Sequence, residues 1–228
     1  MIYLKEFNTQ AEYEAAVKAN EIRRPNVSLV NEPFAVHYNK YVPLGVFIQH
    51  IDGSLYTKDE WSAAGFSNDE ANGVAVVDDL ARFVIAKEDL STTAWGNPGI
   101  LIEGVKTETD YSKAIGDYSG YKNTQYMIAA SDDNAGKACA AYTFPNGSTG
   151  YLPSLGELSV LAGRLSAIQS CLGVVGQRMI IGDYFYWSST QERALLAWSI
   201  LIDRGFGKGA VTKNKSNNMC VRPFTILE

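Results

Sequence analysis

Few residues of this 228-residue chain have the types and spacing that catalysis or metal binding requires. The two histidines, His37 and His50, have no second histidine or cysteine nearby at the spacing of a metal site. Ser188 and Ser189 do not lie in a nucleophile-elbow pattern, and the sequence places no histidine or carboxylate to activate them. The glycine-bearing stretches GDYSGYKN and GFGKG lack the features of a phosphate-binding loop. We therefore predict a protein that is not an enzyme and that needs neither a cofactor nor a metal.

The three cysteines and the overall charge exclude further classes of protein. Cys139, Cys171 and Cys220 are too widely spaced for a paired-cysteine zinc site or a dense disulfide framework. Cys139 and Cys171 lie among small and apolar residues, which is typical of core positions. A net charge of −5 without a dense basic patch argues against a nucleic-acid partner.

The first residues of the sequence do not predict a signal peptide. The lysines of GKGAVTKNKSNN, near the C-terminus, are interpreted as a solvated loop: Lys208, Lys213 and Lys215. The first residues, MIYLKEFNTQ, lack the apolar core of a signal peptide, and no apolar run is long enough to span a membrane. We therefore expect synthesis in the cytoplasm and no membrane insertion.

The stretch LAWSILID predicts a strand with two unlike faces. Side chains alternate across a strand, so Trp198, Ile200 and Ile202 share one face, which we assign to the core. The opposite face mixes a hydroxyl, an aliphatic and an acidic side chain: Ser199, Leu201 and Asp203. A mixture of this kind is typical of a surface position, although an ordinary amphipathic strand with its leucines packed inside gives a similar pattern.

The elements that would carry this strand can be predicted from residue 43 onwards. GVFIQHIDGSLYT predicts a hairpin, and NGVAVVDDLARFVIAKED predicts two strands about a polar turn. NTQYMIAASDD and AGKACAAYTF predict short helices. SLGELSVLAGRLSAIQSCL has nearly helical apolar spacing, and Ser154 with Glu157 predicts a capping box at its start. YFYWSST, LAWSILID and MCVRPF predict the strands that close an α+β domain over residues 43–228.

Residues 1–42 predict a small module of their own. A short strand is expected at Tyr3–Phe7 and a helix at Gln10–Asn20, which Pro25 prevents from continuing. RPNVSLV and NEPFAVHYNK then predict a pair of strands, and YVPLG predicts the junction with the larger domain.

The motifs GYLPSLGELSVL, YWSSTQ, AW, Gly205 and VRPF occur in an order and spacing that identify a family. They resemble the variable proteins of diversity-generating retroelements, in the form found in Bacteroides-type bacteria and their phages. EFNTQAEYEAA, RPNVSLV, VHYN, NGVAVVDD, RFVIA and DYSGYKNT resemble the same group, so the similarity covers most of the chain. It implies a C-type-lectin-like fold related to that of the formylglycine-generating enzyme.

In that family, error-prone reverse transcription diversifies solvent-facing positions while framework residues stay fixed. The resemblance implies a framework at Tyr186, Trp187, Ser188, Ser189, Thr190, Ala197, Trp198, Gly205, Val221, Arg222 and Pro223. It implies a ligand-binding face at Glu192, Arg193, Leu195, Leu196, Ser199, Leu201, Asp203, Arg204, Phe206 and Lys208.

Two properties of related folds are not carried over. The three cysteines form no local pair of the kind that the formylglycine-generating enzymes use for oxidation. The calcium motifs of the sugar-binding lectins, Glu-Pro-Asn or Gln-Pro-Asp with Trp-Asn-Asp, do not occur.

The resemblance therefore implies a receptor-binding protein with a hypervariable surface. A bacterial surface protein or glycan is the expected target, and the N-terminal module is expected to attach the domain to a carrier or tail protein. A phage tail is the expected location, ahead of a cell surface, and a homo-oligomer is compatible with this role. The alternatives are an adhesin or carbohydrate-binding module of fixed specificity, and a degenerate enzyme of the formylglycine-generating type.

Overall fold

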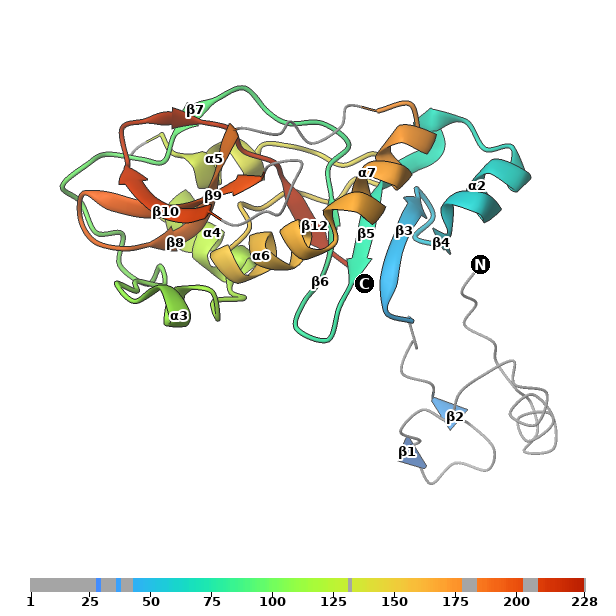
Figure 1. Ribbon diagram of the computed structural model, residues 1–228, viewed down its shortest axis with the longest axis horizontal. Coiled ribbons are helices and arrows are strands. Elements are labelled where there is room, and N and C mark those ends of the chain that lie inside the picture. The colour runs from blue at the N-terminus through green and yellow to red at the C-terminus, as the bar shows by residue number, and fades with distance from the viewer. Residues whose placement is uncertain are drawn as a thin grey trace. The chain divides into compact units, whose positions relative to one another are not determined.

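The computed structural model describes residues 28–29, 36–37, 43–130, 133–177, 184–202 and 209–227 of the chain (Figure 1). The chain divides into two compact units, Met1–Pro43 and Leu44–Glu228. In the first unit, β1 (Ser28–Leu29) pairs antiparallel with β2 (Val36–His37), which confirms the predicted pair of strands. The strand predicted at Tyr3–Phe7 and the helix predicted at Gln10–Asn20 lie outside the described residues.

The second unit has a five-stranded antiparallel sheet in the order β12-β6-β5-β3-β4. Its strands are β3 (Gly45–His50), β4 (Leu55–Tyr56), β5 (Ala71–Val77), β6 (Arg82–Ile85) and β12 (Phe224–Ile226). β3 with β4 and β5 with β6 are the two hairpins that the sequence predicts. β5 is buried along its whole length, as expected for a central strand.

A three-stranded antiparallel sheet, in the order β10-β9-β8, carries the strand with two unlike faces. Its strands are β8 (Tyr184–Gln191), β9 (Leu196–Ile202) and β10 (Gly209–Asn214). A short pair, β7 (Thr93–Ala94) with β11 (Asn218–Met219), lies beside it. MCVRPF is therefore not one strand: it contains the end of β11 and the start of β12, with an irregular segment between them.

The helices are α2 (Lys58–Ala64), α3 (Tyr111–Ala114), α4 (Gly120–Ala129), α5 (Ala135–Ala140), α6 (Leu155–Gly163) and α7 (Leu165–Val174), with a 3-10 turn at Asn68–Glu70. The mixture of these helices with antiparallel sheets confirms the predicted α+β class. The capping box of Ser154 and Glu157 is also confirmed.

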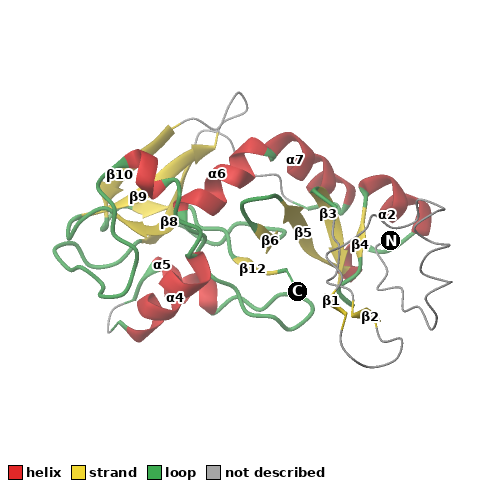
Figure 2. Ribbon diagram, turned by 90° about the horizontal axis from the view of Figure 1, so that it is seen from below, coloured by secondary structure: helices red, strands yellow, loops and turns green. Residues whose placement is uncertain are grey.

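The segment read as one helix in SLGELSVLAGRLSAIQSCL is two helices, α6 and α7, that meet at Arg164 (Figure 2). Arg164 leaves helical geometry at φ −108° and ψ 9°, and its guanidinium forms an ion pair with Asp78 at 2.7 Å. The break lets α6 pack on β8 and β9 while α7 packs on β3 and β5. Apolar spacing continues across the break, so periodicity alone does not reveal it.

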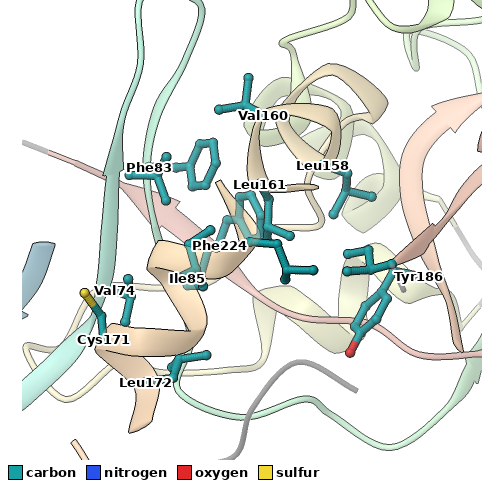
Figure 3. Packing of buried hydrophobic residues seen from close by; sticks show 14 of the residues in the cluster. Val74, Phe83, Ile85, Leu158, Val160, Leu161, Cys171, Leu172, Tyr186 and Phe224 are labelled. Atoms are coloured by element: carbon teal, nitrogen blue, oxygen red, sulfur yellow. The ribbon is translucent and has the colours of Figure 1, made fainter. Parts of the chain in front are cut away.

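The main core lies between these two helices and both sheets (Figure 3). The rings of Phe83 and Phe224 stack with their centroids 4.4 Å apart, and Leu158, Leu161 and Leu172 belong to the same core. A second core lies on the other side of the three-stranded sheet and contains Trp95, Met127, Leu152, Trp187 and Val221. The three-stranded sheet is therefore covered on both faces over part of its length.

The segment Ser188–Thr190 forms an irregularity in β8, because Trp187 pairs with Ser199 whereas Gln191 pairs with Ala197. Three residues of β8 thus lie opposite Trp198 alone, and all three side chains are completely buried. Their hydroxyls are used inside the protein, since Ser188 Oγ donates to the carbonyl of Trp198 at 2.8 Å. The serines of YWSST therefore stabilise the fold and are not exposed nucleophiles.

Thr190 joins this irregularity to a buried polar network. Its Oγ1 donates to Asp117 Oδ2 at 2.7 Å and accepts from the main-chain N–H of Leu155 at 3.0 Å. Asn123 Nδ2 donates to Asp117 Oδ2 at 3.0 Å and to Ser189 Oγ at 3.1 Å. The network connects β8, α4 and α6, which fixes the direction in which β8 leads into the next turn.

Arg222 of the VRPF motif is also a buried framework residue. Its Nε donates to Asp89 Oδ1 at 2.5 Å, and Tyr186 donates its hydroxyl to the other oxygen of the same carboxylate at 2.9 Å. Because a buried carboxylate and guanidinium compensate each other only as a pair, loss of either partner would leave an isolated buried charge.

Candidate ligand-binding surface

The residues of the ligand-binding face implied by the family resemblance differ in exposure. Leu195 and Arg193 are exposed, with Leu195 at 51%, and they lie in the turn between β8 and β9. Glu192, Leu196 and Leu201 are only partly exposed. The remaining positions, Asp203, Arg204, Phe206 and Lys208, lie outside the described residues, as does the framework position Gly205.

The prediction that Ser199 is exposed is wrong. Ser199 is completely buried, and its Oγ donates to the carbonyl of Val211 in β10 at 3.0 Å. Trp187 of β8 and Val211 of β10 are its partners in register on the two sides. Ala197, on the same face of β9, belongs to the second core, whereas Trp198, Ile200 and Ile202 lie in the main core as predicted.

The turn from Glu192 to Leu196 is tightly closed. The carbonyl of Leu196 accepts from the main-chain N–H groups of Glu192 at 3.0 Å and of Arg193 at 3.1 Å. Arg193 Nε lies 3.0 Å from Glu192 Oε2, so these two predicted ligand-binding residues form an ion pair with each other. Leu195 points outward from this closed turn.

The loop that follows β7 lies directly beside this turn. Gly99 of this loop donates its main-chain N–H to the carbonyl of Ala194 at 3.0 Å. On the other side of the turn, the main-chain N–H of Lys215 donates to the carbonyl of Leu195 at 3.0 Å. The loop exposes two large aliphatic side chains, Ile100 at 48% and Leu101 at 53%. Residues about ninety positions apart in the chain therefore form one exposed region.

Lys215 is buried, which corrects its assignment to a solvated loop. Its Nζ donates to the carbonyl of Ile100 at 2.7 Å and to Gln191 Oε1 at 3.0 Å, and it lies 4.3 Å from the centroid of the Trp95 ring. Desolvation by burial lowers the pKa of this ammonium group from 10.5 to about 8. Burial of an ammonium group costs free energy because the group loses its hydration. The two hydrogen bonds and the contact with the Trp95 ring offset this cost, so Lys215 can hold the loop while buried beneath it.

Gln191 holds the same loop at a second point. Its Nε2 donates to the carbonyl of Ile102 at 2.8 Å, and its Oε1 accepts from the main-chain N–H of Ile102 at 3.3 Å. The loop is thus positioned by two buried polar side chains, one from β8 and one from the residue that follows β10. Ile102 packs on the second core, while Ile100 and Leu101 stay exposed to solvent.

A cavity of about 310 Å³ opens between this loop and the end of α4. Tyr126 forms part of its lining and lies against Gly104, where a Cβ atom would approach the Tyr126 ring to 2.4 Å. The lining residues are Trp95, Gly96, Asn97, Ile100, Leu101, Ile102, Glu103, Tyr126, Ala129, Ala130 and Asn134. We call Ile100, Leu101, Tyr126 and Leu195 together the apolar loop surface.

Sequence reasoning did not select the loop, although AWGNPGILIEG contains a usable signal. Ile100, Leu101 and Ile102 are three consecutive apolar residues between glycines, and such a run fits neither a half-buried strand nor a polar loop. An apolar run in a loop must be covered by the fold or left exposed for a partner.

Of the two histidines, His50 lies in an aromatic cluster, whereas the side chain of His37 lies outside what the structure describes. His50 packs against the rings of Tyr56, Trp61 and Phe66, with centroid separations between 5.0 and 6.3 Å. Within the described ranges, no three acidic, histidine or cysteine side chains are grouped as metal ligands. In the same ranges, no helix combines the length and apolar character that crossing a bilayer requires.

Comparison with known proteins gives one informative match. No family model matches the chain, and no curated protein matches it in sequence. Among solved structures, the chain is similar to a fimbrial protein from Bacteroides ovatus, with a TM-score of 0.62 and 18% sequence identity over 82% of this chain and 49% of the other. The chain thus spans about half the length of the fimbrial protein, and at this identity the similarity shows a shared fold.

Proposed function

We propose that this protein is a non-enzymatic ligand-recognition protein displayed on a surface, and that it binds through the apolar loop surface. The observation that carries the proposal is the way this surface is held. Ile100, Leu101 and Leu195 are about half exposed. The buried side chains of Lys215 and Gln191 nevertheless fix the main chain at Ile100 and Ile102, and the main-chain N–H of Lys215 donates to the carbonyl of Leu195. Exposed apolar groups on a preorganised backbone are the usual feature of a binding surface, because little ordering entropy is lost when a partner binds.

Display on a surface is supported by the fold shared with the Bacteroides ovatus fimbrial protein. Hypervariability is supported by a different observation. The framework residues of the family resemblance that are described, such as Trp187, Thr190 and Arg222, are buried, whereas Arg193 and Leu195 are exposed in a turn. A fold with this division tolerates changes in the turn without loss of its core. A reverse-transcriptase gene beside a near-repeat of the 3′ end of this gene would separate a variable protein from an adhesin of fixed specificity.

Binding of the labelled protein to intact Bacteroides cells, measured by flow cytometry, tests the proposed surface. Leu195→Asp introduces a charge into the surface, and we expect it to reduce binding about tenfold, the effect of about 1.4 kcal/mol. The matched control is Leu80→Asp, since Leu80 is 62% exposed in the turn between β5 and β6. An equal loss for both variants would show that the apolar loop surface has no special role.

A further inference from the structure

The outer strand of the three-stranded sheet, β10, has a free edge. In the order β10-β9-β8, β10 pairs with β9 alone among the described strands (Figure 2). All six residues of β10 pair with β9 without a register shift, and none of them is a proline. Edge strands are commonly protected by a proline, a bulge or a charge that points outward. The first two of these protections are missing from β10.

The main-chain groups of β10 divide into two sets by their direction. The carbonyl of Val211 accepts from a side chain of β9 at 3.0 Å, and the N–H of Lys215, just beyond the strand, donates to the carbonyl of Leu195. The main-chain groups of odd-numbered residues therefore point toward β9. Because the direction alternates along a strand, those of Ala210 and Thr212 point away from β9. Within the described residues, these outward groups form no main-chain hydrogen bond.

The side chains beside this edge do not shield it. Val211 is 36% exposed, although it lies in the middle of the strand. The one charged residue of β10 is Lys213, and its ammonium lies 4.3 Å from the centroid of the Phe185 ring on β8. The charge is therefore held over the sheet and not beyond its edge. An edge with unpaired main-chain groups and an exposed β-branched side chain is a template for another strand.

The sequence of β10 fits an antiparallel pair with a second copy of itself. When Val211 faces Val211 of the second copy, Ala210 lies opposite Thr212, and every outward N–H of one copy meets an outward carbonyl of the other. Lys213 then lies opposite Gly209, so the two lysines do not face each other. In the two neighbouring registers, Val211 would lie opposite Lys213 or Gly209 and would lose its apolar partner.

We propose that β10 pairs antiparallel with β10 of a second copy of this chain, and that the two three-stranded sheets thereby form one continuous sheet in a two-fold dimer. The occupant is a second copy because the strand is complementary to itself in hydrogen bonding, in charge and at Val211. A short strand pair buries little area, so association is expected at about micromolar concentration. The dimer carries two apolar loop surfaces, which favours attachment to a target present in many copies.

Sedimentation equilibrium of the purified full chain, from about 1 to about 500 µM, tests the dimer. The wild type is expected to show a reversible equilibrium between monomer and dimer. Val211→Glu and Val211→Lys are each expected to weaken association at least about tenfold, because like charges would face each other across the two-fold axis. An equal mixture of the two variants is expected to restore the dimer, because Glu then faces Lys.

Leu80→Glu is the matched control, since Leu80 is 62% exposed in the turn between β5 and β6. It is expected to dimerise as the wild type does. The proposal is overturned by a wild type that stays monomeric over the whole range, by unchanged association of Val211→Glu, or by a mixture of the two charged variants that stays monomeric.

A proline tests the main-chain hydrogen bonds of the edge. Thr212→Pro removes an N–H that points away from β9, so the pairing with β9 is retained. It is expected to weaken dimerisation about tenfold, whereas Thr212→Val keeps the N–H and is expected to leave dimerisation unchanged. Equal association of these two variants would contradict pairing through this edge. These measurements need no target cell, so their outcome is independent of the Leu195→Asp cell-binding test.

Discussion

At the scale of single residues, the buried lysine Lys215 shows how the loop after β7 is held in place. Lys215 is completely buried, and in the described part of the chain no carboxylate contributes to the shift of its pKa. Its hydrogen bonds instead satisfy the carbonyl of Ile100 and the side chain of Gln191. A lysine in this position holds a loop rather than interacting with solvent.

Lys215→Met tests this role through stability and its pH dependence. At pH 7 the variant is expected to lose about 1–3 kcal/mol of unfolding free energy, because two buried acceptors lose their donor. The pKa of about 8 in the folded state lies below the unfolded value of 10.5. Between these values the unfolded state binds more protons, so this group makes the wild type more stable as the pH rises.

Urea unfolding of wild type and Lys215→Met at pH 7 and pH 9.5 measures the effect. The unfolding free energy of the wild type minus that of the variant is expected to increase with pH. Tyrosines and cysteines also titrate in this range, but they are the same in both proteins and their contributions cancel in the difference. Lys122→Met, at an exposed position on α4, is the control and is expected to change little. A difference that does not change with pH would show that the ammonium is not desolvated.

Trp198 and Leu195 provide a second residue-scale test, since one is buried and the other exposed. Trp198 is 6% exposed and its Nε1 donates to the carbonyl of Glu108 at 2.7 Å. Trp198→Ala is expected to cost about 3–5 kcal/mol in urea unfolding, as for a buried large aromatic side chain. Leu195→Ser is expected to change stability by no more than about 0.5 kcal/mol. A severe loss for Leu195→Ser would contradict its exposure.

At the scale of elements, the loop after β7 is shaped by two glycines with different surroundings. Gly99 has φ +91° and Gly104 has φ +84°, values that side-chain-bearing residues rarely adopt. A Cβ atom at Gly99 would meet open space, whereas at Gly104 it would collide with the Tyr126 ring. The conformation of the loop and its contact with α4 can therefore be tested separately.

Gly99→Ala is expected to cost about 1 kcal/mol of unfolding free energy, the strain of its left-handed backbone alone. Gly104→Ala is expected to cost more, about 2–3 kcal/mol, because the ring of Tyr126 must also move. Addition of Tyr126→Ala to Gly104→Ala should recover the steric part, which a double-mutant cycle of denaturant midpoints measures. Equal costs for the two glycine substitutions would show that Tyr126 does not pack on Gly104.

At the scale of the whole molecule, the unit Leu44–Glu228 is stabilised by two apolar cores and buried polar contacts between distant segments. Asp89 with Arg222 and Asp117 with Thr190 each join residues more than seventy positions apart. We expect these interactions to hold the fold without a metal.

Chelation with EDTA is therefore expected to leave the melting temperature unchanged, as measured by calorimetry. A metal that bound the folded state would stabilise it by mass action, so its removal would lower the melting temperature. A drop on chelation that calcium reverses would contradict the prediction and restore the calcium-dependent lectin alternative.

Local patterns in the sequence were sufficient for the α+β class, the two hairpins, the capping box at Ser154 and the assignment of Trp198, Ile200 and Ile202 to the core. Each depends on residues within a few positions of one another, where periodicity and capping act. The burial of Ser199 and Lys215 could not be predicted in this way. Ser199 lies between its register partners Trp187 and Val211 and donates to the carbonyl of Val211, and Lys215 donates to a carbonyl 115 residues away. Only the tertiary structure places the apolar run at Ile100 beside Leu195, because these segments are far apart in the chain. Alternation in the sequence defines the two faces of a strand, but it does not show which distant segment lies against each face.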